Sequence, residues 1–77
     1  MKVRVELFRD PRLRGRVYLN GAYLGNVPLE RQSDKKRYRP AKVLSKLLPR
    51  SVLNALPDDF YLRMITAKEG DVVEAEI

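Results

Sequence analysis

The stretch Val17-Tyr18-Leu19-Asn20-Gly21-Ala22-Tyr23-Leu24 decides the fold, because it has the pattern of a β-hairpin. Asn-Gly is the preferred pair for a two-residue type I′ turn, in which both central residues need positive φ. A turn of this length fixes the register, with Leu19 opposite Ala22, Tyr18 opposite Tyr23 and Val17 opposite Leu24. We therefore expect the two tyrosines on one face and the aliphatic residues on the core side.

Three further segments have the composition of strands. Residues 2–8 alternate between apolar and charged side chains, which is typical of a half-buried strand. Residues 60–67 are rich in aromatic and branched side chains and predict a second strong strand. Residues 68–71 predict a turn, since Gly70 is available for positive φ, and residues 72–77 predict the last strand.

Between the hairpin and residue 60 the pattern changes. Residues 30–39 are mostly charged and predict an exposed loop. Residues 40–56 have apolar residues at helical spacing, but Pro49 interrupts them, so either two short helices meet there or one helix kinks. The sequence predicts an α+β fold of order β-β-β-α-α-β-β: a five-stranded, mainly antiparallel sheet or partly open barrel, with a kinked or split helical segment packed on one face or end.

The predicted core combines the inward positions of these strands with the apolar stripe of the helical segment. Its members are Val3, Val5, Leu7, Val17, Leu19, Leu24, Leu44, Leu47, Leu48, Val52, Leu53, Leu56, Phe60, Leu62, Met64 and Val73.

Composition narrows the functional class. Seventy-seven residues make one domain, residues 1–77, with a small core. Neither cysteine nor histidine occurs, which removes disulfides, thiolate chemistry, the usual general base and the commonest metal ligand. We interpret the chain as a binding protein and not an enzyme, with no cofactor. High charge and a single glutamine also hint at a thermophilic source.

The hydropathy pattern bears on location. No apolar run approaches the length of a membrane span, which predicts no membrane partner. The first residues alternate charged and apolar side chains, unlike a signal peptide, so we expect a cytoplasmic protein.

Positive charge is concentrated in the middle of the chain. Residues 31–50 contain eight Lys or Arg and one Asp, which is a net charge of +7, whereas the whole chain has a net charge of +6. A helix over this region would align three cations at i, i+4 and i+8, and such a face, fed by a basic loop, could follow phosphates. The alternative is an ordinary solvated helix face. The candidate binding residues here are Lys35, Lys36, Arg37, Tyr38, Arg39, Lys42, Lys46 and Arg50.

A second candidate surface is the outer side of the sheet. Arg4, Phe8, Arg16, Tyr18 and Tyr23 fall on one face if the hairpin register holds. Aromatic rings with interleaved arginines suit base stacking and phosphate contact. Two alternatives stay open: the helices could cover these aromatics, or the face could be a dimer interface.

Acidic residues gather towards the end of the chain, at Asp58-Asp59 and in residues 69–76. Paired carboxylates can hold Mg²⁺ or Ca²⁺, but no EF-hand spacing occurs, so we predict no metal site.

Residues 17–29 resemble the hairpin of PEGA domains, whose pattern is Val-x-Val/Leu-Asp/Asn-Gly-x-x-x-Gly-x-Thr-Pro. Val17, Leu19, Asn20, Gly21, Gly25 and Pro28 match it, while Val27 stands where Thr is usual. Residues 56–62 are also similar to a later PEGA strand that follows a Leu-Pro turn. The helical segment is foreign to that family. The resemblance implies a small β-sandwich module with an interaction role.

These observations predict a small basic module that binds nucleic acid through the loop-helix segment, with the Arg16, Tyr18 and Tyr23 face as a stacking surface. The alternative is a protein-interaction module, such as a small regulator or inhibitor that binds an acidic surface of a larger complex. A homodimer is a third option.

Overall fold

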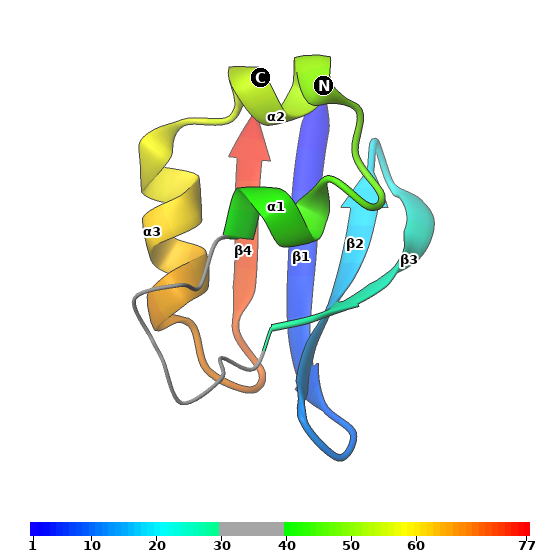
Figure 1. The fold of residues 1–77 in the computed structure, drawn as a ribbon, viewed down its shortest axis with the longest axis vertical. Helices are drawn as coiled ribbons and strands as arrows, with labels where there is room; N and C mark the ends of the chain where they lie inside the picture. Colours follow the sequence, from blue (N-terminus) through cyan, green and yellow to red (C-terminus); the bar gives the residue numbers. More distant parts are fainter. Residues whose placement is uncertain (30–39) are drawn as a thin grey trace.

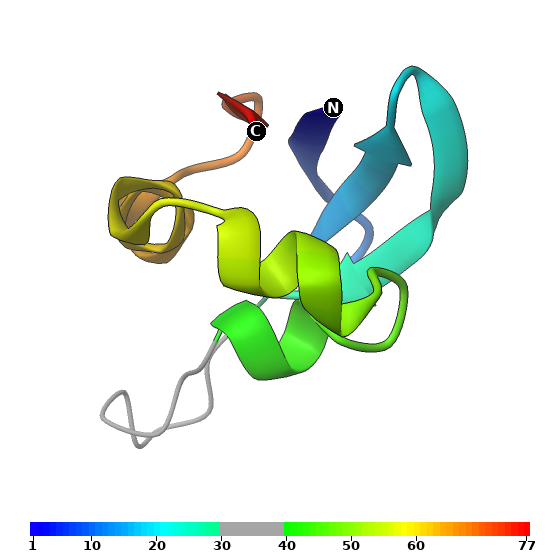
Figure 2. The same ribbon diagram turned by 90° about the horizontal axis from the view of Figure 1, so that it is seen from above.

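The computed structural model describes residues 1–29 and 40–77, which form one sheet covered by short helices (Figure 1). Strands β1 (Lys2–Arg9), β2 (Leu13–Leu19), β3 (Ala22–Pro28) and β4 (Val72–Glu76) pair antiparallel in the order β3-β2-β1-β4. Helices α1 (Pro40–Leu44), α2 (Arg50–Ala55) and α3 (Asp58–Thr66) lie on one face of this sheet (Figure 2). The α+β class is confirmed, but the prediction of five strands is wrong, because the described residues form four.

The missing strand is the segment 60–67, which is helical. Pro57 precedes α3, and Asp58 and Asp59 occupy its first turn, where carboxylates favour the positive end of the helix dipole. Phe60 and Met64, one turn apart, are both buried, while Leu62 between them is exposed. This i, i+4 spacing is the signature of an amphipathic helix, and it outweighs the strand preference of the aromatic and branched side chains.

The hairpin forms as predicted at its tip and differs further along. Asn20 and Gly21 have φ of 52° and 84°, as a type I′ turn requires. Leu19 pairs with Ala22 and Tyr18 with Tyr23, but Val17 pairs with Gly25, so the predicted Val17–Leu24 pair is wrong. The pairing shifts by one residue at this point, a β-bulge that leaves Leu24 without a partner on β2.

The bulge has a steric reason. It places Gly25 on the covered face, where a Cβ atom would come within 3.3 Å of a Leu47 methyl group. Gly25 also has a φ of 141°, which side-chain-bearing residues rarely adopt. Leu47 therefore packs over the backbone of β3 at a position that only glycine fills without strain.

The helical segment 40–56 divides into two short helices. α1 ends at Leu44, residues 45–47 form a turn, and α2 begins at Arg50 directly after Pro49. Proline removes a backbone donor, so a continuous helix through Pro49 is disfavoured. Of the two predicted forms of this segment, the one with two short helices is therefore confirmed. A single helix face shared by Lys42, Lys46 and Arg50 required one continuous helix and is not formed, because Lys46 lies outside both helices.

The core lies between the sheet and the helices. Most predicted members are buried, and Leu19, Leu47 and Leu53 are partly buried against them. Two predictions are wrong: Leu24 is 37% exposed because of the bulge, and Leu62 is 61% exposed because its segment is helical. The core also includes Val27 and Leu29, which the sequence analysis left out.

β1 and β4 bring the two ends of the chain together at one end of the sheet (Figure 1). The amide of Ile77 donates to the Met1 carbonyl at 2.7 Å, and the Met1 ammonium donates to the Ile77 carbonyl at 2.8 Å. Among the residues described, no helix has the length and apolarity needed to cross a bilayer.

Candidate functional site

The sheet has one covered face and one uncovered face. The helices pack on the side of Val3, Val5 and Leu7, which are buried. Because side chains alternate along a strand, the intervening residues of β1 point to the opposite side. The uncovered face of the sheet consists of these residues and their neighbours on the other strands: Lys2, Arg4, Glu6, Phe8, Arg14, Arg16, Tyr18, Tyr23, Asn26, Val72, Glu74 and Glu76.

Strand register arranges the uncovered face in rows. In one row, Arg4 of β1 stands between Glu74 of β4 and Tyr18 of β2, and Tyr23 of β3 follows Tyr18. Two aromatic rings and one cation thus lie side by side on neighbouring strands. Because none of them is on a loop, the backbone hydrogen bonds between the strands hold their spacing.

Aromatic side chains and arginines contact one another on this face. The rings of Tyr18 and Tyr23 lie 5.5 Å apart at an interplanar angle of 54°. The guanidinium carbon of Arg16 sits 3.9 Å from the centre of the Phe8 ring, and that of Arg4 lies 5.8 Å from the centre of the Tyr18 ring. Both distances fall within the range of cation–π attraction, which prefers arginine.

Charge divides the uncovered face into two halves. Near β4 the cations are compensated: Lys2 Nζ is 3.2 Å from Glu74, and Arg4 Nη2 is 2.5 Å from Glu6. Near β2 and β3, Arg14 donates through Nε to the Asn26 side chain at 2.7 Å. Within residues 1–29 and 40–77, neither Arg14 nor Arg16 forms a salt bridge, so this half carries two cations available to an anion.

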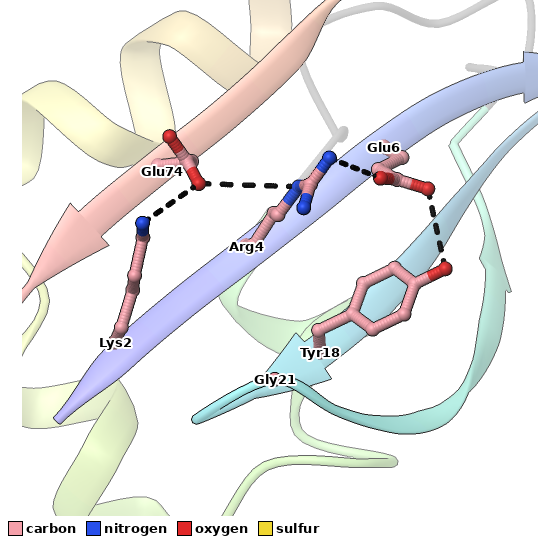
Figure 3. Close-up of a pocket in the computed structure, with 6 residues that line it drawn as sticks. All are labelled: Lys2, Arg4, Glu6, Tyr18, Gly21 and Glu74. Atoms are coloured by element: carbon pink, nitrogen blue, oxygen red, sulfur yellow. Dashed lines mark hydrogen bonds and ion pairs between the residues drawn. The ribbon is translucent and has the colours of Figure 1, made fainter.

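The compensated half contains a shallow depression of about 260 Å³ (Figure 3). It is open to solvent and holds cations, carboxylates and one aromatic ring. Tyr18 closes one side, and its hydroxyl donates to Glu6 Oε1 at 3.2 Å. The residues that line the depression are Lys2, Arg4, Glu6, Tyr18, Gly21 and Glu74.

The environment of Tyr18 keeps its hydroxyl protonated. Desolvation raises the pKa of Tyr18, and the hydrogen bond to Glu6 and the negative charge of that carboxylate raise it further. A tyrosine phenol is protonated at neutral pH in any case and donates here to Glu6; the raised pKa extends this state to higher pH.

The structure separates the sequence-predicted binding residues into two groups. Arg16, Tyr18 and Tyr23 share the uncovered face with Arg4 and Phe8, so the helices do not cover these aromatics. Lys42, Lys46 and Arg50 are exposed, but they belong to the helical layer on the other side of the sheet. Lys35, Lys36, Arg37, Tyr38 and Arg39 lie outside the described residues.

The predicted binding residues do not include the other polar members of the uncovered face. The alternation along residues 2–8 already placed Lys2 and Glu6 there, and the hairpin register could have placed Arg14. Residues 72–77 were predicted to be a strand, but the pairing of β4 with β1 was needed to set Glu74 beside Arg4. Within residues 1–29 and 40–77, no three carboxylates gather closely enough to hold a metal ion.

The chain matches no family model, no curated protein and no solved structure.

Proposed function

We propose that the protein binds single-stranded nucleic acid on the uncovered face of its sheet. The observation that carries the proposal is the group of Phe8, Tyr18 and Tyr23 with Arg16 stacked on Phe8 at 3.9 Å. Aromatic rings accept unpaired bases by stacking, and each stacked base is worth about 1–3 kcal/mol. Bases inside a duplex are already stacked, so a surface that binds bases by stacking favours single strands.

The cations of the uncovered face support contacts with the nucleic-acid backbone. Arg14 and Arg16 border the aromatic rings and have no salt bridge among the residues described. An arginine that stacks on a ring still directs its N–H groups sideways, where a phosphate can accept them. The net charge of +6 adds a long-range attraction for polyanions.

The basic segment has a secondary place in this proposal. Lys42 belongs to α1, Arg50 to α2 and Lys46 to the turn between them. These helices lie on the other face of the sheet (Figure 2), so a strand bound across the tyrosines does not contact the three cations directly. They increase the positive potential around the protein and with it the association rate. We therefore assign binding to the sheet face and not to the loop-helix segment, and we propose no catalytic step.

Two charge-matched variants test the assignment. Arg16→Gln and Arg50→Gln each remove one positive charge, on the uncovered face and in the helical layer respectively. Fluorescence anisotropy with a labelled single-stranded oligonucleotide at low salt should show a much larger loss of affinity for Arg16→Gln. Tyr23→Ala should weaken binding by about 1–3 kcal/mol, since Tyr23 is 53% exposed and its loss leaves the core intact.

Three results would contradict the proposal. These are no binding of any oligonucleotide at low salt, equal losses for the two arginine variants, and full affinity in Tyr23→Ala. The alternative, an acidic protein partner, predicts instead that partners captured from a lysate survive nuclease treatment. A homodimer stays a prediction that light scattering can test.

A further inference from the structure

We infer that the depression lined by Lys2, Arg4, Glu6, Tyr18 and Glu74 is a base-recognition subsite that selects guanine. This inference rests on the proposed function and names the base preference of the same face. Tyr18 lines the depression (Figure 3), and its ring lies 5.5 Å from the ring of Tyr23, so a strand that stacks on these rings passes directly beside the depression.

The carboxylates of the depression retain unused acceptor capacity. A carboxylate offers about four lone-pair sites. Glu6 accepts from the Tyr18 hydroxyl through Oε1 and pairs with Arg4 through Oε2, which leaves one further site on each oxygen. Glu74 uses only Oε2, at 3.2 Å from Lys2 Nζ and 3.9 Å from Arg4 Nε. A ligand can thus add donors to both carboxylates without breaking the existing pairs.

The cations provide the complementary donors. The Lys2 ammonium has three donors and the Arg4 guanidinium has five. Their ion pairs with Glu6 and Glu74 use only some of these donors. Both side chains are about half exposed, 54% for Lys2 and 44% for Arg4, so a base can reach them. The depression therefore presents acceptors and donors within one base-sized space.

Guanine fits this arrangement better than the other bases. Its Watson–Crick edge carries two adjacent donors, N1–H and the N2 amino group, which match the two oxygens of a carboxylate. Its O6 and N7 atoms are acceptors, which Arg and Lys contact most often among specific base contacts. Adenine, cytosine and uracil each have a single donor group on the same edge, and an acceptor beside it that a carboxylate repels.

The walls of the depression suit a flat ring. Tyr18 provides an aromatic surface at one side, and its hydroxyl already orients Glu6. Gly21 lies at the hairpin end, where a Cβ atom would meet no other atom within 4 Å. The nucleotide backbone can therefore leave the subsite over the turn. The volume of about 260 Å³ is below the range of drug-sized pockets and agrees with a single base.

The test compares oligouridines that differ at one central position, which is guanosine, adenosine, cytidine or uridine. Anisotropy titrations with the full chain should give about fivefold or tighter binding for the guanosine oligonucleotide, since one bidentate base contact discriminates by at least about this factor. Glu6→Gln should abolish the preference, because the amide replaces one acceptor with a donor. Its affinity for plain oligouridine should stay equal or rise, since a negative charge is lost.

Glu76→Gln is the matched control. Glu76 lies on the same face and strand as Glu74 but does not line the depression, so this variant has the same charge change and should keep the guanine preference. Glu74→Gln provides a second test should Glu6→Gln unfold, as thermal melts will show. Equal affinity for all four oligonucleotides, or an unchanged preference in both depression variants, overturns the subsite while leaving the proposed function in place. Absence of all binding overturns both.

Discussion

Replacing Phe60 with alanine tests the α3 helix, where the sequence and the structure disagree most. Phe60 is fully buried at 0% exposure and belongs to the core between α3 and the sheet. Truncation of a buried phenylalanine to alanine costs about 3–5 kcal/mol. At roughly 0.05–0.15 kcal/mol per residue, the free energy of unfolding of this 77-residue chain is about 4–12 kcal/mol. The substitution therefore removes a large part of the total stability.

Leu62→Ala is the control that separates helix from strand. In a strand, residues 60, 62 and 64 share one face, and both substitutions would be costly. In α3, Leu62 is 61% exposed, so Leu62→Ala should change the free energy of unfolding by less than about 0.5 kcal/mol.

Urea unfolding followed by circular dichroism measures both variants. Phe60→Ala should lower the midpoint by about 1 M or more, given a typical slope of about 1–3 kcal/mol/M. Should that variant fail to fold, Phe60→Leu should retain a transition with a loss of about 1–3 kcal/mol. Equal losses for Leu62→Ala and Phe60→Ala would refute the helical assignment.

Three further substitutions probe the sheet. Gly15→Ala should cost about 1–3 kcal/mol in urea unfolding, because its Cβ would lie 2.7 Å from Val5 Cγ1, and wild-type stability would contradict this packing. Asn20→Ala should cost about 1–2 kcal/mol, since Asn20 has a φ of 52° and its Oδ1 accepts a hydrogen bond from the Lys2 amide at 2.8 Å. Asn20→Gly should cost less, because it loses this hydrogen bond but adopts the positive φ without strain. Tyr18→Phe should remove one phenol whose pKa is raised by desolvation and by Glu6. Because that pKa is higher in the folded state, its stabilising contribution is present at neutral pH and is lost as pH rises through the raised value. In a spectrophotometric titration, Tyr18→Phe should therefore remove absorbance change at pH values above the usual range of tyrosine pKa values. Removal of absorbance change within the usual range would contradict a raised pKa for Tyr18.

Local patterns predicted the parts of the fold that depend on local rules. The alternation of residues 2–8 placed Val3, Val5 and Leu7 in the core, and Asn20-Gly21 fixed the turn. These predictions are correct because alternation with a period of two is specific to strands and a pair of residues with positive φ is specific to a few turn types. Both tyrosines were placed on one face by the same reasoning.

Long-range packing decided the rest. The spacing of Phe60 and Met64 fits both a strand and a helix. In the structure both are buried while Leu62 between them is exposed, which is the periodicity of a helix. The bulge depends on Leu47 packing over Gly25, a contact between segments far apart in the chain. For the candidate site, the sequence indicated the aromatic face. Only the assembled sheet shows that the helices cover the opposite face and that Glu74 lies beside Arg4.

The adjacency of the two chain ends makes this fold a candidate for circular permutation. A short linker could join Ile77 to Met1, whose backbones already hydrogen-bond, and the chain could be opened between Ala67 and Lys68. The strands would then follow one another as β4-β1-β2-β3, the same order in which they neighbour in the sheet. Every strand pair would become a hairpin between consecutive segments. Such a permutant should refold faster than the natural order in stopped-flow experiments, because its sheet contacts are nearer in sequence.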